Sequence, residues 1–180
     1  MKFEDLIIDN SQTIEKNRLL ENRLIAVRNR NRGTMLSKLP NETHKLETIT
    51  TFRGVTFIND AKSENINSTY YAIEQIKTSM VWIIGSDDAQ TDYKKLLPIV
   101  SSKVRALVCF GTQNERLIEI FKGYIPLVVE CQDINTAVRE AFYASQREGV
   151  VMFSSACPCG QLYADYQQRG DAFKNAIAQL

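Results

Sequence analysis

Short apolar segments alternate with segments of helical pattern from Val55 to the end of the chain. The apolar segments are continuous rather than alternating with polar residues, which is typical of strands that are covered on both faces. The repeat predicts an α/β fold: a doubly wound, Rossmann-like, mostly parallel sheet of about six strands with helices on both faces. The expected strands are 55–59, 81–85, 104–111, 125–130 and 150–154, and the expected helices are 68–77, 92–100, 114–122, 134–146 and 161–180.

A β-hairpin is expected at the start of this pattern. Residues 45–50 and 55–59 are both rich in β-branched residues, and the Arg53-Gly54 pair between them suits a tight turn. The first strand of the sheet is therefore predicted to be antiparallel and to lie at an edge.

The residues before the sheet have a different pattern. Residues 1–43 are predicted to form a basic helical arm, capped by Ser11 and ended by Gly33, ahead of an α/β domain over 44–180. The arm ends in the sequence RNRNRG. Its arginines either form a solvated helix end, where they interact favourably with the helix dipole, or form a patch that binds nucleic acid or phospholipid. The basic residues of the arm are Lys16, Arg18, Arg23, Arg28, Arg30 and Arg32.

Composition narrows the classes of partner. The chain is 44% hydrophobic and 24% charged with a net charge of +1, so it can bury a core and has no overall attraction to nucleic acid or membranes. No apolar run approaches the length of about 18 residues that a membrane span needs, and the acidic N-terminus is unlike a signal peptide. We expect a cytoplasmic protein without a membrane span, for which nucleic acid is not the favoured partner.

The four cysteines predict no disulfide framework in a chain of this length. Cys109 lies within the apolar run ALVCF and is expected to be a buried strand thiol. Cys157 and Cys159 form a Cys-x-Cys pair without further ligands at zinc spacing, so an ordinary strand-to-helix turn is favoured and no metal is expected. Because Cys159 precedes an expected helix start, we predict a lowered thiol pKa.

Polar residues follow the first predicted parallel strand directly. Asp60 and Lys62 come first, and residues 65–69 supply Asn, Ser and Thr oxygens at the expected helix start. Such a start suits an anion, and the carboxylate suits a metal or a ribose hydroxyl, but N-capping with an Asx turn explains the same residues without a ligand. Parallel strands end at one edge of a sheet, so 59–67, 85–92, 111–114 and 154–160 are expected to face a common crevice.

No G-x-x-x-x-G-K-[ST] phosphate loop occurs in the sequence. The 180 residues therefore have no visible means of holding a nucleoside triphosphate by themselves.

Several long motifs together resemble the C-terminal domain of the Mur ligases, most closely the branch that adds D-glutamate in peptidoglycan precursor synthesis. They are HKLETI, GVTFINDAKSENINSTYYAIE, VWIIGSDDAQTDYKKLLPIV, VRALVCFG and GVVMFSSACPCGQLYADYQQRGDAFKNAI, and the match runs from about His44 to the C-terminus. The family consists of three-domain enzymes that use ATP to convert a muramoyl-peptide carboxylate to an acyl phosphate, which an amino acid then attacks. The central domain of these enzymes carries the phosphate loop.

The resemblance assigns roles to particular positions. Lys45, Asp60, Lys62 and Asn65 correspond to nucleotide-side positions, and Lys62 is the candidate catalytic residue. Lys45 replaces an arginine there, which keeps the charge and loses the bidentate fork. The amino-acid-side positions are substituted, because the family typically has threonine, lysine, serine and phenylalanine where this chain has Glu64, Ala89, Cys159 and Tyr166.

These substitutions act against an acidic substrate. Buried carboxylates need cations and donors around them, whereas Ala89 removes a charge partner and Glu64 and Asp88 add repulsion. The first hypothesis is a non-catalytic binding or regulatory module of the cytoplasm, a pseudoenzyme that works without a cofactor. The second is a fragment or split subunit of an ATP-dependent, ADP-forming ligase, which needs ATP, Mg²⁺ and a Mur-type ATP-binding protein or cell-wall synthesis enzyme as partner. The third is a nucleic-acid or membrane-surface module acting through the basic arm.

Overall fold

The computed structural model describes residues 42–85, 88–146, 149–160 and 162–180. These residues belong to one compact unit that spans Asn41–Leu180. The predicted helical arm lies outside the described residues except for its last two positions, so the helix and its basic patch stay predictions.

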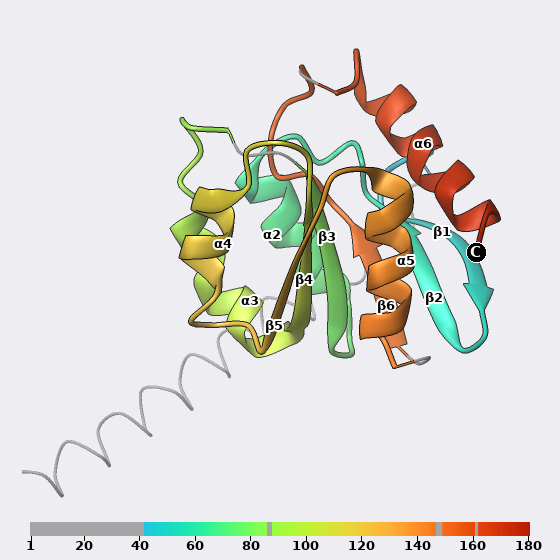
Figure 1. The fold of residues 1–180 in the computed structure, drawn as a ribbon, viewed down its shortest axis with the longest axis horizontal. Coiled ribbons are helices and arrows are strands. Elements are labelled where there is room, and N and C mark those ends of the chain that lie inside the picture. The colour runs from blue at the N-terminus through green and yellow to red at the C-terminus, as the bar shows by residue number, and fades with distance from the viewer. Residues whose placement is uncertain (1–41, 86–87, 147–148, 161) are drawn as a thin grey trace, which may run out of the picture. The chain divides into compact units, whose positions relative to one another are not determined.

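The described residues contain a six-stranded sheet with the order β1-β2-β6-β3-β4-β5 (Figure 1). The antiparallel pair is β1 with β2, and every other neighbouring pair is parallel. This arrangement confirms the predicted fold class and the edge hairpin. The strands are β1 Glu47–Phe52, β2 Val55–Asn59, β3 Met80–Gly85, β4 Val104–Phe110, β5 Leu127–Cys131 and β6 Gly149–Phe153.

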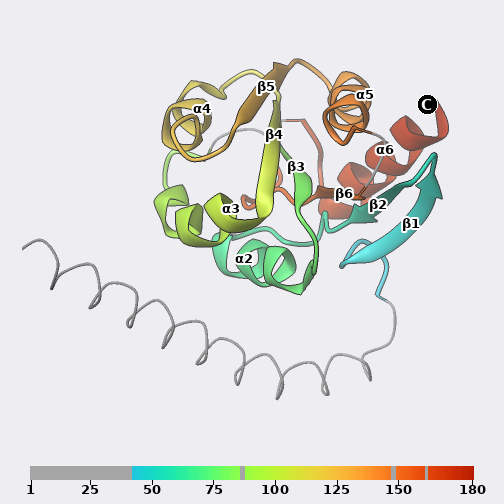
Figure 2. The ribbon, with the colours of Figure 1, turned by 90° about the horizontal axis from the view of Figure 1, so that it is seen from below.

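Helices cover both faces of the sheet, as Figure 2 shows most clearly. One face carries α2, α3 and α4, and the other carries α5 and α6. The elements are α2 Ile66–Gln75, the 3₁₀ helix η1 Tyr93–Leu96, α3 Leu97–Lys103, α4 Glu115–Phe121, α5 Ile134–Ala144 and α6 Tyr166–Ala178.

Two hydrophobic cores explain why the strand segments are continuously apolar. Successive side chains of a strand point to opposite faces. Val81 and Ile83 of β3 therefore pack toward α5 and α6, while Trp82 and Ile84 pack toward α2, α3 and α4. All four are fully buried, and each such side chain stabilises the fold by roughly 1.5–3 kcal/mol.

The hairpin turns through Arg53 and Gly54, which both have positive φ, at 48° and 89°. Two such residues are typical of the tight turns whose twist matches that of the flanking strands. The first strand begins at Glu47, two residues later than predicted. The reason is local, because His44 and Leu46 have φ values of 64° and 47°, and left-handed residues cannot join an extended ladder.

Three predicted helices differ at their starts, and the one predicted over 92–100 consists of η1 followed by α3. The α2 helix begins at Ile66 because the Asn65 side chain caps it. The predicted helix over 161–180 is wrong at its start, since α6 begins at Tyr166, where the Asp165 side chain accepts from Gln168 N. Cys159 therefore does not lie at a helix start.

The parallel strands β2, β3, β4 and β6 end at one edge of the sheet, as predicted. Strand β6 lies between β2 and β3, and the helices that follow β3 and β6 lie on opposite faces. The loops after these two strands consequently diverge, which is the kind of place where doubly wound sheets bind ligands. Within the described ranges, none of the helices is both long and apolar enough to cross a bilayer.

Candidate functional site

Asp60 ties three segments together at the strand ends. Its side chain is 1% exposed. Oδ2 accepts a hydrogen bond from Ser154 Oγ at 2.8 Å, after β6, and Oδ1 accepts one from Leu46 N at 3.1 Å, before β1. Burial raises the pKa of Asp60 to about 6, and the hydrogen bonds from Ser63, Ser154 and Leu46 oppose this increase. Both oxygens are therefore engaged inside the protein.

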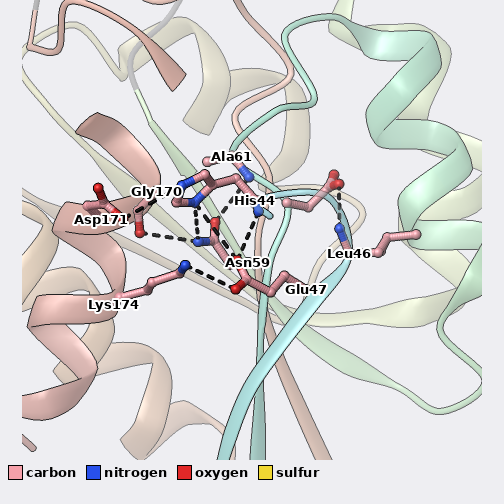
Figure 3. A network of polar contacts seen from close by, with 9 residues as sticks. His44, Leu46, Glu47, Asn59, Ala61, Gly170, Asp171 and Lys174 are labelled. Atoms are coloured by element: carbon pink, nitrogen blue, oxygen red, sulfur yellow. Dashed lines mark hydrogen bonds and ion pairs between the residues drawn. The ribbon is translucent and has the colours of Figure 1, made fainter. Parts of the chain in front are cut away.

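Asn59 joins the segment before β1 to α6 (Figure 3). Its Oδ1 accepts from Ala61 N at 3.2 Å, which fixes the orientation of the amide group. Nδ2 then lies 3.1 Å from Gly170 O and 3.0 Å from His44 Nδ1 and donates to both. His44 Nδ1 is consequently an acceptor, and the ring proton is on Nε2, 3.6 Å from Asp171 Oδ1.

Gly170 is required by this arrangement. A Cβ atom at this position would lie 2.1 Å from His44 Nδ1. Glycine costs a helix interior roughly 0.5–1 kcal/mol relative to alanine, so close packing of α6 against His44 explains its presence.

Glu47 gives the same junction a second connection, also visible in Figure 3. Its Oε2 accepts from His44 N at 2.8 Å and its Oε1 accepts from Lys174 Nζ at 3.0 Å. Burial raises the pKa of Glu47, but these hydrogen bonds and the Lys174 charge outweigh burial and hold the pKa below its ordinary value.

The two lysines of the predicted nucleotide side share one carboxylate. Lys62 Nζ donates to Glu42 Oε1, and Lys45 Nζ lies 3.7 Å from Glu42 Oε2. The hydrogen bond with Glu42 raises the pKa of Lys62 and lowers that of Glu42. Lys62 Nζ also lies 5.4 Å from the centroid of the Tyr166 ring. Tyr166, predicted on the amino-acid side, thus joins the lysine group.

Asn65 is separate from this group. Its Oδ1 accepts from Ser68 N at 3.0 Å and from Ser68 Oγ at 3.1 Å, so the side chain is occupied as the N-cap of α2. The structure therefore brings Lys45, Lys62 and Asp60 to one corner of the crevice and gives Asn65 a capping role.

Arg169 and Glu64 form the other corner. The Arg169 side chain is buried, and it donates from Nη1 to Cys157 O at 3.3 Å and from Nη2 to Ala61 O at 2.8 Å. Glu64 Oε1 lies 3.8 Å from Arg169 Nη2 and accepts from Cys159 N at 3.3 Å. Arg169 borders a small hollow whose lining also includes Gly85, Phe110, Cys157, Pro158, Cys159, Leu162 and Tyr163.

The Cys159 thiol of this corner is not activated. Burial raises the pKa of Cys159 to about 11; Arg169 opposes this increase, and the Glu64 side chain adds to it. The predicted lowered pKa is wrong, because no helix dipole acts on this thiol. Cys157 is buried and its Sγ donates to Gly85 O at 3.4 Å, as suits a strand-to-helix turn. Cys109 is fully buried, as predicted, and burial raises its pKa to about 12.

The remaining predicted positions lie in another loop. Ala89 is exposed in the turn after β3. Asp88 accepts from Gln90 N at 3.2 Å and Thr91 Oγ1 at 2.6 Å, and its carbonyl oxygen accepts from Arg116 of α4. These contacts hold the loop to α4 and give Asp88 a local role in the turn. No group of three or more His, Cys, Asp or Glu residues suited to a metal ion occurs in the described part of the chain.

Curated relatives match most of the length of the chain. The chain is 36% identical over 137 residues to the UDP-N-acetylmuramoylalanine–D-glutamate ligase of Christiangramia forsetii, which covers 76% of this chain and 31% of that protein. It is 36% identical over 145 residues to the ligase of the same name from Porphyromonas gingivalis, with 81% and 32% of the two chains covered. No model of a protein family matches the chain.

The chain belongs to the Mur ligase family. It spans about a third of the length of these Mur ligases and corresponds to their C-terminal-like domain. Among solved structures, the MurF ligase of Thermotoga maritima in complex with ADP aligns at 10% identity over 79% of this chain and 33% of its own, with a TM-score of 0.48.

Two residues of this Mur ligase domain were missed as site components by sequence reasoning. Glu42 precedes Lys62 by 20 positions and has no motif around it. Arg169 lies within the last of the matching motifs, which assigns it no role, although its neighbour Gly170 carried a usable signal. A glycine inside an amphipathic helix indicates a close approach, and here the contact is His44.

Proposed function

We propose that this Mur ligase domain is a binding or regulatory module related to peptidoglycan precursor synthesis and is non-catalytic by itself. One observation carries the proposal. The cations of the candidate site are paired with carboxylates of the chain itself: Lys45 and Lys62 with Glu42, and Arg169 with Glu64.

The chemistry of an acyl-phosphate ligase explains why this pairing matters. In such a reaction the phosphates and the carboxylate of the amino acid bring several negative charges into one active site. Cations of the protein must therefore point at these groups. A cation already neutralised by an internal carboxylate contributes less to a bound anion. The buried, fully engaged Asp60 is likewise poorly placed to hold a metal ion or a ribose hydroxyl.

A ligase of this kind must also bind ATP, and the sequence offers no phosphate loop for it, which supports the proposal. The 180 residues contain no phosphate loop, so ATP and Mg²⁺ enter the proposed function only through a partner with an ATP-binding domain. We propose a Mur-type ATP-binding protein or a cell-wall synthesis enzyme as that partner.

Phosphate release tests the proposal. The purified chain is mixed with ATP, Mg²⁺, D-glutamate and UDP-N-acetylmuramoylalanine, and the Christiangramia forsetii ligase is assayed in parallel as the positive control. We expect release from the ligase and background from this chain. Turnover by the chain alone, abolished in Lys62→Ala, would overturn the proposal.

A split-ligase function is favoured by one observation, the placing of Lys45, Lys62 and Asp60 at one corner of the crevice. In this alternative the chain completes an ATP-dependent ligase. The test adds the chain to a Christiangramia forsetii ligase truncated of its corresponding last third. Restored phosphate release that depends on Lys62 would support the alternative, and a truncated ligase that stays inactive would count against it.

A further inference from the structure

The two edges of the described sheet differ in their side chains and in their regularity. Strand β1 has the sequence ETITTF, with exposed threonines and a shift of register between Thr48 and Thr50. Irregularities such as β-bulges turn an edge strand away from other chains and so hinder pairing. Strand β5 has the sequence LVVEC, its register with β4 is continuous, and Leu127 is 45% exposed. The β5 edge is therefore regular, apolar and accessible.

The backbone of β5 directs hydrogen-bonding groups outward at this edge. Cys131 O accepts from Gly111 N at 3.1 Å, so the peptide groups of Cys131 face β4. The direction alternates along a strand, so the groups of Val129 also face β4, whereas the N–H and C=O of Val128 and Glu130 point away from it. Among the described strands, β5 has β4 as its one neighbour. Val128 and Glu130 thus offer two donors and two acceptors to a further strand.

These outward groups select one way of pairing two copies of β5. Antiparallel pairing suits a two-fold axis, because each copy then offers the same groups to the other. With Val128 opposite Val128, Glu130 would lie opposite Pro126, which has no N–H to donate. With Glu130 opposite Glu130, two like charges would face each other, which is destabilising. The remaining register places Val128 opposite Glu130 on both sides of a Val129 pair, and each Val128–Glu130 pair exchanges both of its backbone hydrogen bonds.

The side chains of β5 fit this register on both faces of the sheet. Strand β5 lies between α4 and α5 at the end of the sheet (Figure 2), with Val129 packed toward the α5 side and Val128 toward the α4 side. On the α5 side, Val129 would meet Val129 and the exposed Leu127 would meet Cys131. On the α4 side, Val128 would meet the aliphatic part of Glu130. Apolar groups are covered, and no like charges lie directly opposite each other.

We propose that the β5 edge is the interface of a two-fold symmetric dimer of this chain, in which two six-stranded sheets join into one. The partner is a second copy because the edge is complementary to its own two-fold image in donors, acceptors and apolar side chains. A strand pair of this length is a small interface, so the dimer is weak and reversible. The crevice at β2, β6 and β3 lies beyond β4 from this edge and stays accessible, so the dimer is a property separate from the proposed function.

Sedimentation velocity of the purified full chain at increasing concentration tests the interface. The wild type should pass from monomer to dimer as its concentration rises. Glu130→Pro removes an N–H that faces the partner and leaves the bonds to β4 intact, since proline is tolerated where the N–H of an edge strand faces outward. The symmetric dimer loses this donor twice, so its dissociation constant should rise about tenfold or more. Glu130→Ala is the matched control, because it removes the same carboxylate, keeps the N–H and should remain dimeric.

A cross-link tests the register and does not depend on the folding of Glu130→Pro, which circular dichroism checks. In an antiparallel pair without hydrogen bonds the two Cα atoms lie about 4.5 Å apart, which a disulfide can span. Val129→Cys should therefore give a disulfide-linked dimer on oxidation, seen on a non-reducing gel. Thr50→Cys on the exposed β1 edge is the control and should remain monomeric. The wild type, oxidised in parallel, gives the background from the native thiols.

Two outcomes would overturn the proposed dimer. One is a wild type that sediments as a monomer up to about 100 μM. The other is a dimer in which Val129→Cys cross-links no more than Thr50→Cys, which would place the interface elsewhere on the chain. Neither measurement involves phosphate release, so failure here is distinguishable from failure of the proposed function.

Discussion

At the residue scale, burial of the strand-end carboxylate of Asp60 raises its pKa and makes its contribution to stability depend on pH. A group whose pKa in the folded state is raised from 3.8 to about 6 takes up a proton in the folded protein before it does in the unfolded chain. Its contribution to stability is therefore complete below about pH 4 and is lost as the pH rises through about 6. This increase in pKa from 3.8 to about 6 corresponds to about 3 kcal/mol of stability between these limits.

Urea unfolding of the wild type and of Asp60→Asn, measured from pH 4 to pH 7, tests this pH dependence. The free energy of unfolding of the wild type, minus that of the variant, should decrease as the pH rises, because the asparagine cannot titrate. Asp133→Asn serves as a control of opposite sign, since hydrogen bonds from Thr136 lower the pKa of Asp133. Parallel pH profiles for wild type and Asp60→Asn would contradict the prediction.

At the element scale, α6 docks on the segment before β1 through Gly170 and His44. Gly170→Ala should destabilise the protein by about 1–3 kcal/mol, because the new methyl group overlaps the His44 ring and must displace it from Asn59. The measurement is the free energy of unfolding in urea. Gly123→Ala is the matched control, since no atom lies within 4 Å of a Cβ placed at Gly123.

A second substitution separates this clash from a loss of helix or loop stability. In His44→Ala the ring is absent, so adding Gly170→Ala should cost much less than it does in the wild type. Equal costs in the two backgrounds would show that the ring contact is not the reason for the glycine.

The elements were predictable from the sequence to a greater extent than their ends or the site. The apolar runs indicated the strands of the parallel sheet, and Arg53-Gly54 indicated the hairpin, because both signals are local. The starts of β1 and α6 depend on left-handed residues before Glu47 and on the Asp165 cap, which compete with simple periodicity. The pairing of Glu64 with Arg169 could not be predicted, since it joins loops that meet only after the sheet has formed.

At the scale of the whole molecule, the sheet is completed by one of its last elements. Strand β6 pairs with β2 on one side and with β3 on the other, so it joins the hairpin to the remaining strands. Without β6 the hairpin has no parallel partner, and a two-stranded hairpin is marginally stable by itself. The six-stranded sheet therefore cannot form until the residues from Gly149 onward are present.

This topology predicts that a chain ending at residue 148 does not fold cooperatively, although it retains β1 to β5. Circular dichroism should show a loss of ellipticity without a sigmoidal urea transition, because the cores on both faces lose Val151, Met152 and Phe153. Removal of Gln179 and Leu180 alone serves as the control, since both residues follow α6 and are exposed, and this chain should unfold like the wild type. A cooperative transition in the chain that ends at residue 148 would mean that the sheet from β3 to β5 is an independent folding unit. Strand β6 would then be added to an existing core.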